Sequence, residues 1–130
     1  MLLLAPPKPA SLHPNWVTGF SDGESSFLVS LTKSDRYKSG WYIVPTFAIE
    51  LSNKDLPLLL RIQEYFGVGI IHSIKNKGHS GHFVFAVNSI KALHDFIIPH
   101  FEKYALLTVK RKNSLLFKEV IELMYEKKTS

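Results

Sequence analysis

The chain has 130 residues, 45% of them hydrophobic, and a formal net charge of +5 at pH 7. This size and composition predict one globular domain with its own core and leave no room for a second domain. The absence of cysteine excludes disulfides and thiolate metal sites, and no apolar run reaches the roughly 18 residues that a membrane-spanning helix needs. The positive charge favours an anionic partner, either nucleic acid or an acidic membrane surface.

The N-terminal segment, residues 1–13, joins a short apolar stretch to several prolines. The apolar stretch is too short for a signal peptide, so we interpret this segment as a tail or linker. Residues 14–125 are predicted to form the domain, and residues 126–130 a C-terminal tail.

A short apolar helix follows the tail. Pro14 suits the first turn of a helix, and Trp16, Val17 and Phe20 then recur at helical spacing before Gly23. A helix of about ten residues is marginal in water, so packing must hold it.

Two features of this helix go against local rules. Gly19 in mid-helix costs roughly 1 kcal/mol relative to alanine, but with Gly23 it forms a strip of small residues that another backbone can approach closely. Asp22 and Glu24 place negative charge at the carboxyl end, where the macrodipole disfavours it. A bound Mg²⁺ or Ca²⁺ would reverse that penalty. The plainer interpretation is that Asp22 closes a turn and Glu24 is a solvated loop residue.

A strand and a charged turn are predicted next. Phe27, Val29 and Leu31 alternate with polar residues, which indicates one buried and one wetter face, with Leu28 an exception on the wetter side. Residues 34–40 then form a polar turn.

The second arm of this hairpin, residues 42–52, places Ile43 on the buried side. Pro45 indicates an edge or a bulge at that position. A helix capped by Asp55 then runs to about Phe66 and stops at Gly67.

A second hairpin is predicted from residues 70–75 and 82–88. Ser89 begins a third helix that Pro99 ends or kinks, and a last helix covers residues 108–125. Two strand pairs alternating with helices predict an α+β fold, an antiparallel sheet with helices on one face.

Two groups of residues that contain histidine are candidates for chemical sites. His72, His79 and His82 lie near one hairpin, but without cysteine and beside turn glycines we do not expect a zinc site. His94 and Asp95 are neighbours in a helix and point about 100° apart, so we interpret them as surface residues.

The string VTGFSDGES in the first helix resembles the nine-residue signature of the LAGLIDADG homing endonucleases. Gly19 and Asp22 match, and Glu24 replaces the final aspartate conservatively. Ser21 is polar where the signature is apolar, and Ser25 stands in place of glycine.

The likeness extends over residues 14–125. The predicted element order is the αββαββα order of a LAGLIDADG repeat, and residues 67–69 and 98–108 resemble the family as well. The chain is thus similar to one repeat, and residues 1–13 could join it to another. The fold that this implies is a saddle-shaped antiparallel sheet with helices on one face.

The resemblance implies hydrolysis of DNA phosphodiester bonds with a divalent metal ion, Mg²⁺, for which Ca²⁺ or Mn²⁺ could substitute in binding. Glu24 would be the metal ligand, and Gly23 would offer its backbone carbonyl. Lys110 would stabilise phosphate charge or position water, and Asn53 would order water. Asp22 would close the helix end.

The free face of the sheet and the two hairpin tips are the expected surface for double-stranded DNA, because polar side chains read base edges while cations contact phosphates. By charge alone an ordinary solvated sheet is as good an interpretation, and the resemblance decides for DNA. The expected DNA-binding residues are Ser26, Ser30, Thr32, Lys33, Arg36, Lys38, Tyr42, Thr46, Ala48, Glu50, Ser52, Lys75, Lys77 and His79.

Cleavage of a duplex needs two motif helices, and this chain has one. We therefore expect a homodimer, or a second LAGLIDADG repeat, packed against Trp16, Gly19, Phe20 and Gly23. No membrane partner is expected.

Two other functions fit the same fold. One is a maturase that binds intron RNA, and the other is a non-catalytic DNA-binding regulator, against which the retained Glu24 argues. Members of the family are often encoded in organelles, and the absence of an evident targeting peptide fits synthesis inside a mitochondrion or another organelle as well as it fits the cytosol.

Overall fold

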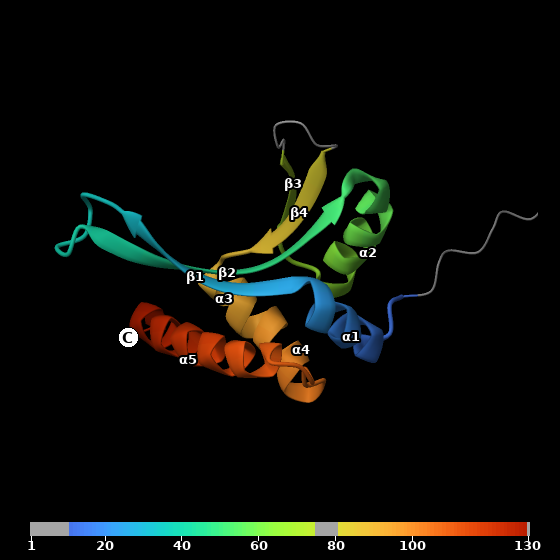
Figure 1. Cartoon of the computed structure of the whole chain (residues 1–130). Coiled ribbons are helices and arrows are strands. Elements are labelled where there is room, and N and C mark those ends of the chain that lie inside the picture. The colour runs from blue at the N-terminus through green and yellow to red at the C-terminus, as the bar shows by residue number, and fades with distance from the viewer. Residues whose placement is uncertain (1–10, 75–80, 130) are drawn as a thin grey trace, which may run out of the picture.

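The structure, a computed structural model, describes residues 11–74 and 81–129 (Figure 1). Most of the predicted tail, residues 1–13, lies outside this part, as do Lys75, Lys77 and His79. The elements are α1 (Pro14–Glu24), β1 (Ser25–Lys33), β2 (Trp41–Ser52), the 3₁₀ turn η1 (Asn53–Asp55), α2 (Leu56–Phe66), β3 (Ile70–Ile74), β4 (His82–Val87), α3 (Ile90–Ala92), the π-helical turn η2 (Leu93–Ile97), α4 (Ile98–Lys103) and α5 (Lys110–Thr129).

The four strands form one antiparallel sheet in the order β1-β2-β4-β3. In Figure 1 the sheet arches over α3, α4 and α5, and α1 leads directly into the edge strand β1. The predicted α+β architecture and αββαββα order are confirmed. Among the described residues, no helix is both long and apolar enough to cross a membrane.

The core lies between the sheet and the helices. Phe47 and Phe85 on the inner face of the sheet are fully buried, and Phe47 packs against Phe101 with ring centroids 5.5 Å apart. Phe27 meets Phe117 of α5 at 5.3 Å. Each such aromatic side chain buries a large apolar area, so this cluster fixes how the helices sit under the sheet.

Local signals set most element ends. Gly67 ends α2 in the left-handed conformation, at φ 72°, as its sequence position predicts. The prediction that Asp55 caps this helix is wrong in detail, since its side chain makes no cap hydrogen bond. Pro45 lies in the part of β2 that pairs with β1 alone, because the pairing of β2 with β4 begins at Phe47. On the β4 side, the missing N–H of the proline therefore breaks no hydrogen bond between strands.

Two predicted helix ends differ from the structure. Of the two outcomes expected at Pro99, the helix does not end there, since α4 continues through it to Lys103, but its winding is irregular just before the proline, at the π-helical turn η2. The wider π turn makes room for the proline ring, which would otherwise clash with the preceding turn. The last helix continues past the predicted end at Tyr125 as far as Thr129, so most of residues 126–130 continue a helix.

The buried side predicted for the first hairpin is buried only at its base. Val29, Leu31 and Ile43 are all exposed, Leu31 to 66%. Figure 1 shows the distal part of the hairpin rising away from α5, so helices cover only the part of this face near α1.

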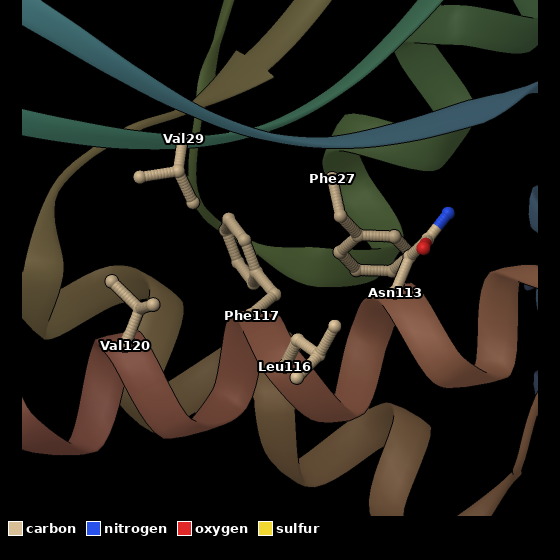
Figure 2. A pocket seen from close by; sticks show the side chains of 6 residues that line it. All are labelled: Phe27, Val29, Asn113, Leu116, Phe117 and Val120. Atoms are coloured by element: carbon tan, nitrogen blue, oxygen red, sulfur yellow. The ribbon is translucent and has the colours of Figure 1, made fainter.

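An open cavity of about 170 Å³ lies between β1 and α5, where α5 stops covering the sheet. In Figure 2, Phe27 and Val29 point from β1 towards side chains of α5. Its lining residues are Phe27, Val29, Asn113, Leu116, Phe117 and Val120.

Candidate active site

One side of α1 anchors the helix in the protein. Val17, Thr18 and Ser21 are buried, and the Thr18 hydroxyl donates to the carbonyl oxygen of Tyr104 at 2.8 Å. At the amino end, the His13 side chain accepts from the amide of Asn15 at 3.1 Å. These contacts fix α1 against α4, as its short length requires.

His100 of α4 completes this anchor. Its Nε2 lies 3.0 Å from the Thr18 hydroxyl, and its Nδ1 lies 2.9 Å from the Tyr65 hydroxyl. The Thr18 hydroxyl already donates its proton to the Tyr104 carbonyl, so it can only accept from His100. Nε2 of His100 therefore carries a proton and donates to Thr18, while Nδ1 accepts from the Tyr65 hydroxyl. Burial lowers the pKa of His100 to about 4, so the ring is neutral and both nitrogens are satisfied.

The Asp22 carboxylate faces the segment that precedes α5. One oxygen accepts from the amide of Leu107 at 2.9 Å, and the other accepts from the amide and the hydroxyl of Thr108 at 3.1 and 2.8 Å. Partial burial raises the pKa of Asp22, but the hydrogen bonds from Leu107 and Thr108 and the charge of Lys110 outweigh it, so the pKa lies below its ordinary value. Asp22 therefore ties the carboxyl end of α1 to the start of α5.

Lys110 is the first residue of α5, and its ammonium reaches back to α1. Its Nζ donates to the backbone carbonyl oxygen of Asp22 at 3.1 Å. A cation at this position complements the negative carboxyl end of α1. The structure thus brings the predicted Lys110 to the end of the helix that carries Glu24.

Glu24 differs from Asp22 in having no such partners. It is exposed at the last position of α1, beside the exposed Gly23. Within residues 11–74 and 81–129, its carboxylate makes no ion pair or side-chain hydrogen bond. It is therefore free to bind a group from outside the chain.

The predicted Asn53 lies farther from this point. It stands in η1, and its amide donates to the carbonyl oxygen of Gly81 at 3.0 Å. Ile49 is the residue paired with Ser25 at the start of β1, so Ser52, the last residue of β2, lies about 10 Å farther along the strand direction, and Asn53 follows it in η1. The register places Glu50, next to Ile49, closer to the end of α1 than Asn53.

The register of β1 and β2 groups the predicted base-reading residues. Ser26 lies opposite Ala48, and Thr32 lies opposite Tyr42. Alternation then places these residues on the face away from the helices: Ser26, Ser30, Thr32, Tyr42, Thr46, Ala48, Glu50 and Ser52. Their predicted grouping is confirmed by the pairing.

The basic residues of the first hairpin tip are divided between two positions. Arg36 and Lys38 are exposed in the turn after β1. Lys33 lies on the helix side of the sheet, with its ammonium 5.5 Å from the centre of the Trp41 ring. A cation–π contact holds it there, so it is less available to phosphates than its position in the sequence predicts.

The same face holds residues that our sequence analysis did not assign. His82 pairs with Glu50 at 3.2 Å, and alternation adds His72 and the exposed Ile70 of β3. The period-2 alternation of β3 and β4 indicates which of their residues share a face. Only the pairing of β4 with β2, rather than with β1, places His72, His82 and Ile70 beside Glu50.

Comparison with known proteins agrees with this geometry. The family model described as LAGLIDADG endonuclease matches residues 17–121. The chain belongs to this family. A relative, probable intron-encoded endonuclease 2 of Neurospora crassa, is 45% identical over 120 residues, which are 92% of this chain and 26% of that protein. The chain thus spans about a quarter of the length of this curated relative.

Two solved structures of the LAGLIDADG family show the same fold. I-SmaMI bound to an uncleaved DNA target in the presence of calcium ions is 42% identical with a TM-score of 0.81, over 90% of this chain and 39% of that one. The homing endonuclease I-TnaI is 26% identical with a TM-score of 0.82, over 90% of this chain and 76% of that one.

The outer side of the LAGLIDADG helix is open. Trp16 is 42% exposed and stacks on Phe20 with ring centroids 5.1 Å apart. Gly19 and Gly23 lie on the same side, and a Cβ at either position would meet nothing within 4 Å. No contact within the described chain therefore requires glycine at these two positions.

The site fits a divalent metal in part. A free carboxylate beside backbone carbonyls is the hard-oxygen set that Mg²⁺ and Ca²⁺ prefer. Among the described residues there is no group of three or more acidic, histidine or cysteine side chains that could enclose an ion. Within the described residues, Glu24 and the backbone carbonyl of Gly23 could contribute oxygens to such a site but could not enclose an ion by themselves.

Proposed function

We propose that this chain supplies half of a metal-dependent endonuclease that cuts double-stranded DNA at specific sites. It acts as a homodimer or as one repeat of a two-repeat enzyme. The observation that carries the proposal is the free Glu24 carboxylate at the end of the LAGLIDADG helix, the same helix end whose Asp22 carbonyl binds the Lys110 ammonium. The family, and a relative named an intron-encoded endonuclease, support it.

DNA is proposed to lie on the face of the sheet away from the helices. Hydroxyls at Ser26, Ser30 and Thr32 can read base edges in the major groove, and Arg36 and Lys38 at the hairpin tip can neutralise phosphates. The long hairpin, which extends past the helices, would follow the groove. I-SmaMI, with the same fold, has been seen bound to its DNA target.

At the site itself, each residue has a proposed task. Glu24 and the Gly23 carbonyl would hold Mg²⁺, and a bound Mg²⁺ would supply charge neutralisation on the scissile phosphate and activation of water. Lys110 adds positive charge beside the same phosphate. Asn53 remains a proposed water-ordering residue, and its distance along β2 leaves Glu50 as a second candidate for that task.

Two copies are proposed to meet through the LAGLIDADG helices. Gly19 and Gly23 would allow the two helices to approach closely, and the stacked rings of Trp16 and Phe20 would border this helix contact. This arrangement places two Glu24 carboxylates side by side, where shared cations screen their repulsion. I-TnaI, of which this chain covers 76%, is the relative whose length supports a single-repeat enzyme.

Calcium is proposed to support binding, as I-SmaMI was observed with its uncleaved target in the presence of calcium ions. The relative in Neurospora crassa is named as intron-encoded. We extend this to the proposal that the present chain is also encoded in an organelle intron.

Glu24→Gln tests the proposed function. The change keeps shape and hydrogen bonding but removes the charge that attracts Mg²⁺, so cleavage of a target selected from a randomised library should fall by about 10³-fold or more. Duplex binding should persist. Calorimetric titration with Ca²⁺ in the presence of DNA should show weaker metal binding, a readout independent of cleavage.

Glu64→Gln is the matched control, because Glu64 is an exposed glutamate on another helix, α2. It should leave cleavage, DNA binding and metal binding unchanged. Unchanged cleavage by the Glu24→Gln protein would remove Glu24 from the active site. DNA binding by wild type without cleavage of any selected site would favour the regulator instead.

A further inference from the structure

A closed loop of hydrogen bonds joins α1 to α5 through Thr108. The Thr108 hydroxyl donates to the Asp22 carboxylate at 2.8 Å and accepts from the amide of Lys110 at 3.2 Å. The Lys110 ammonium then returns to the backbone carbonyl of the same Asp22 at 3.1 Å. Thr108 therefore contacts Asp22 on one side and the start of the helix that carries Lys110 on the other.

The protons of this loop are fully assigned by its partners. A carboxylate only accepts, so the hydroxyl proton of Thr108 must point at Asp22. A lone pair of the same oxygen then faces the Lys110 amide, which caps the first turn of α5. Only a side chain that both donates and accepts can fill this position, and valine, of the same shape, can do neither.

The side chains on either side of Thr108 contribute little packing. Leu107 and Val109, on either side of Thr108, are 88% and 83% exposed. The nearest buried neighbours are Leu106 before the segment and Ser114 within α5. Leu106 anchors the chain before this segment. Between Leu106 and α5, the position of Lys110 depends on the hydrogen bonds to Asp22, from the backbone amides as well as the Thr108 hydroxyl, and on the bond from the Lys110 amide to that hydroxyl.

We propose that Thr108 is a positioning residue of the cleavage site, which fixes the Lys110 ammonium at the carboxyl end of the LAGLIDADG helix. The proposal deepens the proposed function and rests on it for its catalytic part. A lysine side chain is long and flexible, and fixing its first atoms reduces the positions that its ammonium can sample. Thr108 itself touches neither metal nor phosphate in this scheme and acts through Lys110.

Thr108→Val and Thr108→Ser form the test pair, measured by single-turnover cleavage and by duplex affinity. Thr108→Val should lower the cleavage rate constant about 10- to 100-fold, because a small displacement of a catalytic group has this effect. Duplex affinity should stay within about threefold, and Thr108→Ser should restore the rate to within about threefold of wild type. Val109→Thr, a same-size exchange at the exposed neighbour, is the control and should change neither quantity.

Side-chain NMR of Lys110 without DNA or metal gives a second, independent readout. In wild type and Thr108→Ser, its ammonium signal should be separate from the signals of solvent-exposed lysines. In Thr108→Val it should merge with them.

A Thr108→Val protein that cuts at the wild-type rate, or a Thr108→Ser protein as slow as Thr108→Val, would overturn the positioning role. An unchanged Lys110 signal in Thr108→Val would overturn it as well. Failure of the proposed function looks different: wild type would cut no selected target, while the Lys110 signal would still separate Thr108→Ser from Thr108→Val.

Discussion

The two sides of the LAGLIDADG helix differ in their contacts: one is buried in the protein and the other is open. The inner side, with Val17, Thr18 and Ser21, is buried and linked by hydrogen bonds to α4. The outer side, with Gly19 and Glu24, has no partner among the described residues of the chain. Changes on the inner side should therefore act on folding, and changes on the outer side on assembly and cleavage.

The largest expected effect on the inner side is the pH dependence that His100 produces. Its pKa is about 4 in the folded protein and 6.5 when exposed, so the unfolded chain binds the proton more readily. The stabilisation is complete above pH 6.5 and is lost as pH falls from 6.5 to 4, in total about 3 kcal/mol in the free energy of unfolding. Urea unfolding of wild type and His100→Gln across this range measures the difference.

His72→Gln serves as the control for that titration, because His72 is exposed on β3. His100→Gln should show a smaller loss of stability in acid than wild type, and His72→Gln shows what the same exchange does at an exposed position. Equal slopes for wild type and His100→Gln would mean that the link between α1 and α4 does not depend on a neutral His100.

On the outer side, Gly19→Leu should separate assembly from folding. A Cβ at position 19 would meet nothing within 4 Å, and leucine favours a helix more than glycine does, so the unfolding free energy of the monomer should not fall. The dimer dissociation constant should rise about 100-fold, equivalent to about 2.7 kcal/mol. Sedimentation velocity over a concentration series measures it.

Glu64→Leu places the same side chain on an exposed position of α2 and should leave dimerisation unchanged. A wild-type chain that stays monomeric at every concentration, with and without duplex, would contradict the homodimer. Loss of monomer stability in Gly19→Leu would show that the two sides of α1 are not independent.

The smallest effect on the free energy of unfolding is expected at Ser21, on the inner side of α1. Its hydroxyl is fully buried and has no hydrogen-bond partner in the described part of the chain. Ser21→Ala should raise the free energy of unfolding by about 1 kcal/mol, since an unsatisfied polar group is removed and alanine favours the helix. Thermal or chemical unfolding measures this gain.

Ser25→Ala is the matched opposite case. The Ser25 hydroxyl donates to the carbonyl of Ser21 at 2.7 Å, so its removal should lower the free energy of unfolding by about 1 kcal/mol. A loss of stability in Ser21→Ala would mean that its hydroxyl has a partner, such as a buried water.

Serine at position 25 is compatible with the turn despite the glycine of the family signature. Its backbone is extended, at φ −89° and ψ 164°, a conformation open to any residue. Its departure from the signature therefore leaves the helix end intact, and its hydroxyl adds a bond there.

The sequence by itself determined the motif helix, the element order and which strand residues share a face. These features depend on local periods and on residues such as Pro14 and Gly67, whose backbone preferences act within a few positions. The candidate Glu24 was also identifiable, because its charge opposes the helix dipole and its neighbours match the family signature.

Only the tertiary structure decided the partners of those residues. Asp22 binds amides 85 and 86 positions away, and Thr18 meets His100 across 82 positions, distances over which local patterns carry no information. Alternation showed which face of β1 is apolar, but the exposure of Leu31 depends on how far α5 extends beneath the sheet. A strand pattern defines the direction of a side chain, while packing against distant elements determines whether anything covers it.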